Sequence, residues 1–96
     1  ELVNNYNDVR ILSIAFSKLS ALYIKKGDAQ KALDSIDNIN KLKGGFLQDF
    51  AYYQGAAILE TIGKTEEARV RYKELAERFP NSPFAPMAKK RSESQK

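Results

Sequence analysis

Histidine and cysteine are both absent from this 96-residue chain. Histidine is the commonest general base and metal ligand, and cysteine is the readiest nucleophile. Serines are present, but no lysine or carboxylate stands at a motif spacing that would activate one. We therefore predict that the chain is not an enzyme and that it has no catalytic residue, no cofactor and no metal site. The lack of cysteine leaves the redox compartment undetermined.

Two pairs of carboxylates, Asp34 with Asp37 and Glu74 with Glu77, lie three residues apart. On a helix, such a pair can in principle share a hard cation with water molecules. The same spacing is ordinary on a solvated helix surface, and we interpret both pairs in that way.

Long apolar runs are also missing. No stretch approaches the roughly 20 apolar residues that a membrane span needs, and no charged-then-apolar segment resembles a signal peptide. We expect no membrane insertion by this fragment. An anchor or signal would have to lie upstream of Glu1.

The positive charge of the chain is concentrated at one end. The net charge is +4, but residues 1–86 carry 12 basic and 11 acidic side chains, so the last ten residues supply most of the excess. The cluster from Lys89 to Arg91 lacks the interleaved aromatic residues that a nucleic-acid site would have. We predict no nucleic-acid partner. A tail that binds nucleic acid is the alternative, and it predicts a steep salt dependence.

An internal repeat is the most informative feature that is present. Residues 13–48 align with residues 49–84 at a shift of 36, so that aromatic, small, apolar and glycine positions recur together. The matching pairs are Phe16 with Tyr52, Ser20 with Ala56, Tyr23 with Leu59, Gly27 with Gly63, Ala32 with Ala68, and Ile36 with Tyr72. A unit of this size cannot bury its apolar face alone, so the pattern predicts stacked helical repeats.

Turn and cap residues place the expected helices. Gly27 and Gly63 suit the turn inside each repeat, and Asp28 and Thr65 suit the N-caps of the helices that follow. Asn7 or Asp8 is the expected cap of the first helix, which runs to about Lys26, and Gly44-Gly45 is the expected turn between the repeats. Three charged pairs at a spacing of four are expected on the outer face of the fourth helix: Glu67 with Arg71, Lys73 with Glu77, and Glu74 with Arg78.

At these positions the chain resembles the tetratricopeptide repeat (TPR) family, whose unit is about 34 residues long. The departures from the family pattern are Gly55, where leucine is usual, and two extra residues near Gly44. The resemblance implies an all-α, TPR-like right-handed α-solenoid in a single domain over residues 1–96. It comprises a first repeat at about 13–48, a second at about 49–82 and a capping helix at about 83–94. The first helix is apolar almost all round, so we expect a C-terminal fragment of a longer solenoid.

In the resembled family, the first helices of successive repeats line a concave groove that binds a peptide or partner helix. Carried over residue by residue, the groove positions are Ile14, Ser17, Ala21, Ile24, Phe50, Tyr53, Ala57 and Glu60. The resemblance thus implies a non-catalytic protein-interaction module, a scaffold or chaperone adaptor, with an apolar groove. Two alternatives stay open. The groove aromatics can be covered by the capping helix or an upstream repeat, and the first helix can mediate self-association as a homodimer with no separate ligand.

A second resemblance rests on the C-terminal half. The run 63–69 and the Phe-Pro-Asn-Ser-Pro-Phe-Ala run at 79–85 are similar to the ends of bacterial cell-envelope TPR proteins. These include the membrane-anchored TPR-like family to which the ancillary subunit of the Sec translocon belongs. The resemblance implies an envelope-facing role, on the periplasmic side of a bacterial membrane. The residues alone do not fix the compartment, the partner or the number of preceding repeats.

Overall fold

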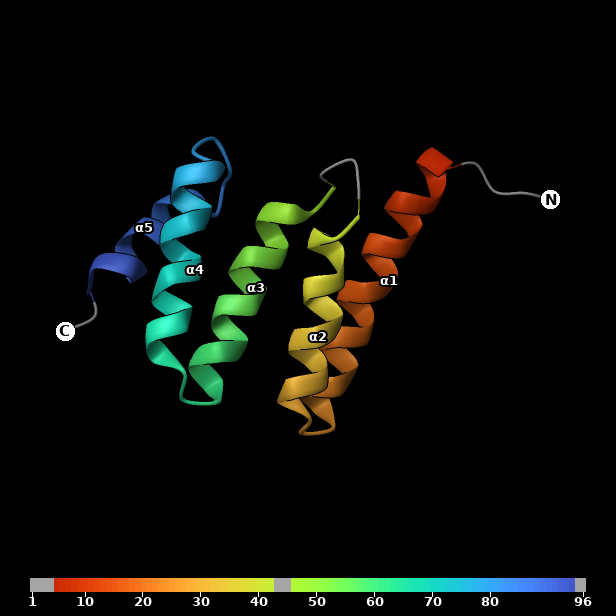
Figure 1. The fold of residues 1–96 in the computed structure, drawn as a ribbon, viewed down its shortest axis with the longest axis horizontal. Coiled ribbons are helices and arrows are strands. Elements are labelled where there is room, and N and C mark those ends of the chain that lie inside the picture. Colours follow the sequence, from red (N-terminus) through yellow and green to blue (C-terminus); the bar gives the residue numbers. More distant parts are fainter. Residues whose placement is uncertain (1–4, 43–45, 95–96) are drawn as a thin grey trace.

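Five α-helices follow one another along residues 5–42 and 46–94, the part of the chain that the computed structural model describes (Figure 1). No β-strand occurs in this part. The helices are α1 Asn5–Lys25, α2 Ala29–Asn40, α3 Gln48–Thr61, α4 Thr65–Arg78 and α5 Ala85–Ser94. Each packs against the next, which gives an elongated slab of 52 × 32 × 17 Å. The predicted all-α helical repeat is confirmed.

The two turns inside the helical pairs have the same geometry. Gly27 and Gly63 have φ angles of 83° and 85°, in the left-handed region that glycine enters without a Cβ penalty. In each turn the residue after the glycine donates its N–H to a carbonyl five residues back, Asp28 to Tyr23 and Lys64 to Leu59, over 2.9 and 2.8 Å. This bond satisfies a carbonyl that the helix end would leave unpaired.

The helix bounds beside the two turns repeat with the same offset. α1 and α3 end at Lys25 and Thr61, and α2 and α4 begin at Ala29 and Thr65, so each pair differs by 36 residues. The register predicted from the sequence is therefore the register of the helices.

The N-caps agree with prediction at one of three helices. The Asp28 carboxylate accepts a hydrogen bond from the Lys31 N–H at 3.1 Å, as expected for the cap of α2. Thr65 is instead the first residue of α4, and the cap residue is Lys64, which makes no side-chain bond. α1 begins at Asn5, so Asn7 and Asp8 lie inside it. The turn expected at Gly44-Gly45 lies outside the described residues.

Small residues are buried where the helices of each pair cross. Ala32 and Ala56 are fully buried, and Ala68 is 1% exposed. In the first pair, the buried Ser20 hydroxyl donates to the Ala32 carbonyl at 2.9 Å, which ties α1 to the start of α2. Around these crossings lie the large buried side chains of the core, Ile36, Ile39, Leu59, Tyr72 and Leu75.

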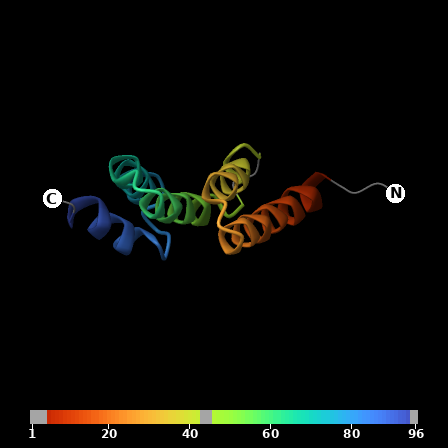
Figure 2. The ribbon, with the colours of Figure 1, turned by 90° about the horizontal axis from the view of Figure 1, so that it is seen from below.

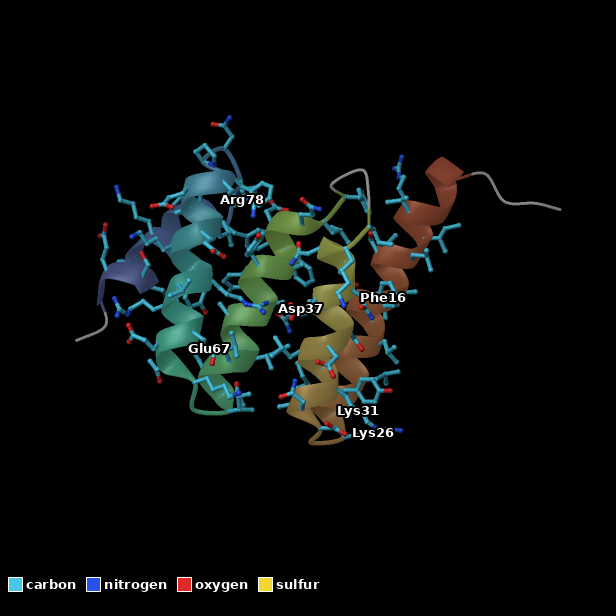
Figure 3. All side chains as sticks on the ribbon, viewed as in Figure 1. Phe16, Lys26, Lys31, Asp37, Glu67 and Arg78 are labelled. Atoms are coloured by element: carbon cyan, nitrogen blue, oxygen red, sulfur yellow. The ribbon has the colours of Figure 1, made fainter. Side chains whose placement is uncertain are left out.

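None of the three charged pairs predicted along α4 forms, although Glu66 and Arg69 pair along this helix. The Arg71 side chain extends from α4 to Asp37 on α2, with Nη1–Oδ1 and Nη2–Oδ2 distances of 2.6 and 3.0 Å. Figure 3 shows Asp37 on the side of α2 that faces α3. Arg78 donates to the Tyr52 hydroxyl at 2.7 Å. Both arginines thus bind across helices, because each lies near an acceptor on a neighbouring helix.

Gly55 explains how Arg71 crosses α3. A Cβ atom at Gly55 would overlap Arg71 Nη1 and would lie 3.6 Å from Leu33 Cδ1. The departure from the repeat pattern at this position therefore leaves the space through which Arg71 reaches Asp37.

Candidate functional site

The predicted groove positions belong to α1 and α3, which lie on the same side of the slab. In Figure 2, α1, α3 and α5 run along one side and α2 and α4 along the other. The first helices of the two repeats therefore share one surface, as the predicted groove requires.

On α1 this surface is open. Ile14 and Ile24 are 44% and 43% exposed, and Ala21 is also exposed. Ser17 is half-buried, and its hydroxyl donates to the Ile14 carbonyl at 2.9 Å. The α1 side of the surface is thus mainly apolar, and its one hydroxyl is already bonded to the helix backbone.

A groove of about 300 Å³ lies where the end of α1 and the following turn meet α3. It brings together two predicted residues, Ile24 from α1 and Ala57 from α3. The remaining lining residues are Gly27, Ala29, Gln54, Ile58 and Thr61. None of the lining side chains is charged, so the groove suits an apolar group.

The aromatic residues of the predicted site, Phe50 and Tyr53, are partly buried against the C-terminal segment. Phe84, which precedes α5, stacks on Tyr53 with ring centroids 5.0 Å apart and an interplanar angle of 19°. It also contacts Phe50 at 6.0 Å between centroids, and Tyr53 contacts Tyr72 at 6.2 Å. The α3 half of the surface therefore agrees with the alternative in which the C-terminal segment covers these aromatic residues.

Glu60 is held by the same C-terminal region. Its carboxylate accepts a hydrogen bond from the Tyr72 hydroxyl at 3.2 Å and is bonded by Arg91 Nη1 at 3.0 and 3.3 Å. The Arg91 guanidinium also lies 5.7 Å from the centre of the Tyr72 ring. One member of the basic cluster at 89–91 thus fastens α5 onto α3 and α4.

These contacts change the acidity of the Tyr72 phenol. Burial raises the pKa of Tyr72 to about 12, and the negative charge of Glu60 adds to the rise. Removal of the phenol from water disfavours its charged form, and the neutral hydroxyl is the form that donates to Glu60.

We expect a pH-dependent loss of stability from this group. An unfolded tyrosine has a pKa of about 10, so the folded state holds the phenol proton more tightly. This contribution to stability is fully present below pH about 10 and is lost as the pH rises through about 12. Urea unfolding at several pH values in this window should show a steeper fall for the natural protein than for Tyr72→Phe. Equal slopes would contradict the assignment.

Five groove residues were not among the predicted positions: Gly27, Ala29, Gln54, Ile58 and Thr61. The last three fall with Ala57 at a helical spacing of three and four, and this spacing was the available signal. The α3 positions carried over from the family pattern are spread along the helix, and only Ala57 among them lines the groove.

Metal binding finds no support at the carboxylate pairs. Within the described ranges, no cluster of three or more acidic, histidine or cysteine side chains has the proximity to hold an ion. Asp37 is bonded to Arg71 through both oxygens. None of the helices that the structure describes is long and apolar enough to cross a membrane.

Comparison with known proteins gives one match. Residues 49–82, about a third of the chain, match the family model described as tetratricopeptide repeat. No curated protein and no solved structure matches the chain. TPR repeats generally mediate protein–protein interaction and are typically not catalytic. The match covers α3 and α4, the pair whose turn and adjoining helix bounds recur in α1 and α2. The second helical pair therefore carries the sequence pattern of the TPR family, and the described chain has an all-α, TPR-like helical repeat fold.

Proposed function

We propose that this domain is a non-catalytic protein-interaction module that binds an extended or helical segment of a partner in the groove between α1 and α3. The observation that carries the proposal is the open, uncharged groove bounded by Ile24 and Ala57. Apolar side chains of a partner would lie against these two residues, and burial of such groups drives most protein association.

The proposed contact surface is smaller than the eight predicted positions. It keeps the α1 residues Ile14, Ser17, Ala21 and Ile24 together with Ala57. Phe50, Tyr53 and Glu60 instead contact Phe84 and Arg91 of the same chain. We propose that these three residues hold the C-terminal segment in place and do not contact the partner.

Gln54 is the polar group that would orient the bound segment. The other polar lining side chain, Thr61, already donates its hydroxyl to the Ala57 carbonyl at 3.0 Å. A few polar groups in an apolar site commonly fix the orientation of a ligand. The Gln54 amide can donate to and accept from a partner backbone, so the favoured partner is an uncharged segment with one apolar anchor.

The context in which to seek this partner comes from the resemblance of residues 63–69 and 79–85 to bacterial cell-envelope proteins. A scaffold or chaperone-adaptor role there is a proposal that rests on this resemblance alone. A partner isolated from envelope extracts would support it only if its binding depends on the groove.

We expect Ala57→Glu to weaken partner binding by at least about tenfold, because it places a charge where an apolar anchor is buried. Peptides selected from a random library on the natural domain would be measured by fluorescence anisotropy against both proteins. Val70→Glu is the matched control, because Val70 lies on α4 with 51% exposure, outside the groove lining. Equal affinity for Ala57→Glu and the natural domain would overturn the groove as the site.

Self-association through α1 is the second candidate, and the exposure of Ile14 and Ile24 on that helix favours it. Sedimentation velocity over a range of concentrations separates the two. A dimer that resists dilution and prevents peptide binding would replace the peptide-binding proposal.

A further inference from the structure

A second apolar surface lies on α1, separate from the groove. It consists of residues on one face of the helix, which we term the edge face: Ile11, Leu12, Ala15, Leu19 and Leu22. Their side chains are exposed, from 38% at Leu19 to 59% at Ile11. A contiguous apolar patch of this kind on a soluble domain commonly marks an interaction site.

The internal repeat shows what this face packs against elsewhere in the molecule. A shift of 36 residues places Leu47, Gln48, Ala51, Gly55 and Ile58 of α3 at the positions of the edge face. Ala51 is fully buried, Ile58 is 3% exposed, and Gly55 is buried beside Leu33 of α2. On α3 these positions therefore accept a helix, α2, which runs antiparallel to α3 (Figure 1).

Basic side chains predominate along the edge face. Residues 9–27 contain no carboxylate, although Asp8 stands one turn before Ile11, and they include Lys18 and Lys25 of α1 and Lys26 of the turn that follows. Lys31 of α2 lies nearby, with its ammonium 5.8 Å from the centre of the Tyr23 ring. Figure 3 shows Lys26 and Lys31 at the same end of the α1–α2 pair.

α2, the helix that packs on α3, has more acidic than basic side chains. α2 carries Asp34 and Asp37 against the single cation Lys31, while α3 itself has no lysine or arginine. The edge face of α1 thus combines the apolar positions of a helix-binding surface with a basic border that the α3 surface lacks. Complementary charge raises the rate and specificity of association.

We propose that the edge face docks an acidic amphipathic helix of another protein, which lies antiparallel to α1 as α2 lies on α3. The partner helix carries apolar residues at spacings of three and four, with aspartate or glutamate on both sides of that stripe. A second copy of the chain is disfavoured as the occupant, because two edge faces packed antiparallel would bring their Lys18 side chains together near the middle of the contact. This proposal does not depend on the groove.

Two synthetic helical peptides test the charge of the partner on the full chain. Both carry leucines at positions 1, 5, 8 and 12, and they differ only in having glutamate or lysine beside the leucine stripe. By fluorescence anisotropy we expect the glutamate peptide to bind at least about tenfold more tightly, with an affinity that falls as salt rises. The double substitution Ile11→Ser/Leu22→Ser should lower the affinity for the glutamate peptide at least about tenfold. Because both side chains are more than half exposed, it should leave the helical circular dichroism spectrum unchanged.

A charge reversal gives the sharper test. Lys18→Glu/Lys25→Glu should reverse the preference, so that the lysine peptide binds more tightly than the glutamate peptide. Val70→Ser on α4 and Ala57→Glu in the groove are the matched controls, and both should retain the affinity of the natural chain for the glutamate peptide.

Three results would overturn the proposal. The first is equal or absent binding of the two peptides. The second is a concentration-dependent dimer in sedimentation that Leu22→Ser abolishes, which would assign the edge face to a second copy. The third is co-sedimentation with phosphatidylserine vesicles without binding of the glutamate peptide, which would assign it to an anionic lipid surface.

Discussion

Tyr72→Ala is expected to lower the free energy of unfolding by about 3–5 kcal/mol, the usual cost of removing a large buried aromatic side chain. Tyr72 is the largest fully buried residue, with 1% of its surface exposed. Its ring contacts Tyr53 and lies under the Arg91 guanidinium, so one side chain joins α3, α4 and α5. Alanine would leave a cavity at the meeting point of three helices. Urea denaturation followed by circular dichroism measures the loss.

The matched control is Tyr72→Phe, which keeps the ring and removes the hydroxyl. It should cost only about 0.5–1.5 kcal/mol, the net contribution of a typical hydrogen bond. Glu60 remains bonded to Arg91 in this variant, so no buried charge loses its last partner. If phenylalanine cost as much as alanine, the hydrogen bond to Glu60 rather than the packing of the ring would be the main source of stability.

The register of the fold was predictable because it depends on local chemistry that recurs. Gly27 and Gly63 permit the left-handed turn, and Ala32 and Ala68 permit the close crossing that follows each turn. Each residue type acts over a few positions of the chain, so its consequence can be inferred from the sequence alone. The domain boundaries proposed from the same alignment remain a prediction.

The covered half of the predicted surface was not predictable in the same way. Phe84 follows α4 after the Pro80 turn, and its position on Tyr53 depends on the path of the chain through that turn. The sequence showed an aromatic residue ahead of a capping helix, but it left open whether Phe50 and Tyr53 faced a partner or this residue. Only the three-dimensional path decides between the two.

The partner of Arg71 was also missed, and for a related reason. Helical spacing indicated Glu67 on the same helix, whereas the structure pairs Arg71 with Asp37, 34 residues away. An acidic residue four positions away is visible in a sequence, but a gap in a neighbouring helix is not. Gly55 appeared as a departure from the family pattern, and its consequence for Arg71 became apparent only when α2, α3 and α4 were placed together.

Gly55→Leu is expected to destabilise the domain by about 1–3 kcal/mol, although leucine is the residue that the family pattern favours at this position. The first side-chain carbon would already overlap Arg71 Nη1, and the larger side chain would press against Leu33 of α2. Arg71 would have to leave Asp37, which would separate two half-buried charges that now share two hydrogen bonds. Thermal and urea unfolding of the variant would measure this cost.

A double-mutant cycle with the smaller Gly55→Ala change isolates the role of Arg71. In the Arg71→Ala background no guanidinium occupies the space, so alanine should stabilise the helix by up to about 1 kcal/mol through its higher helix propensity. In the natural background the same change displaces Arg71 and should be neutral or destabilising. The expected coupling is therefore on the order of 1 kcal/mol, within the range found for residues in direct contact. Additive effects would show that Gly55 and Arg71 act independently, which would contradict the assignment of this space to the Arg71 side chain.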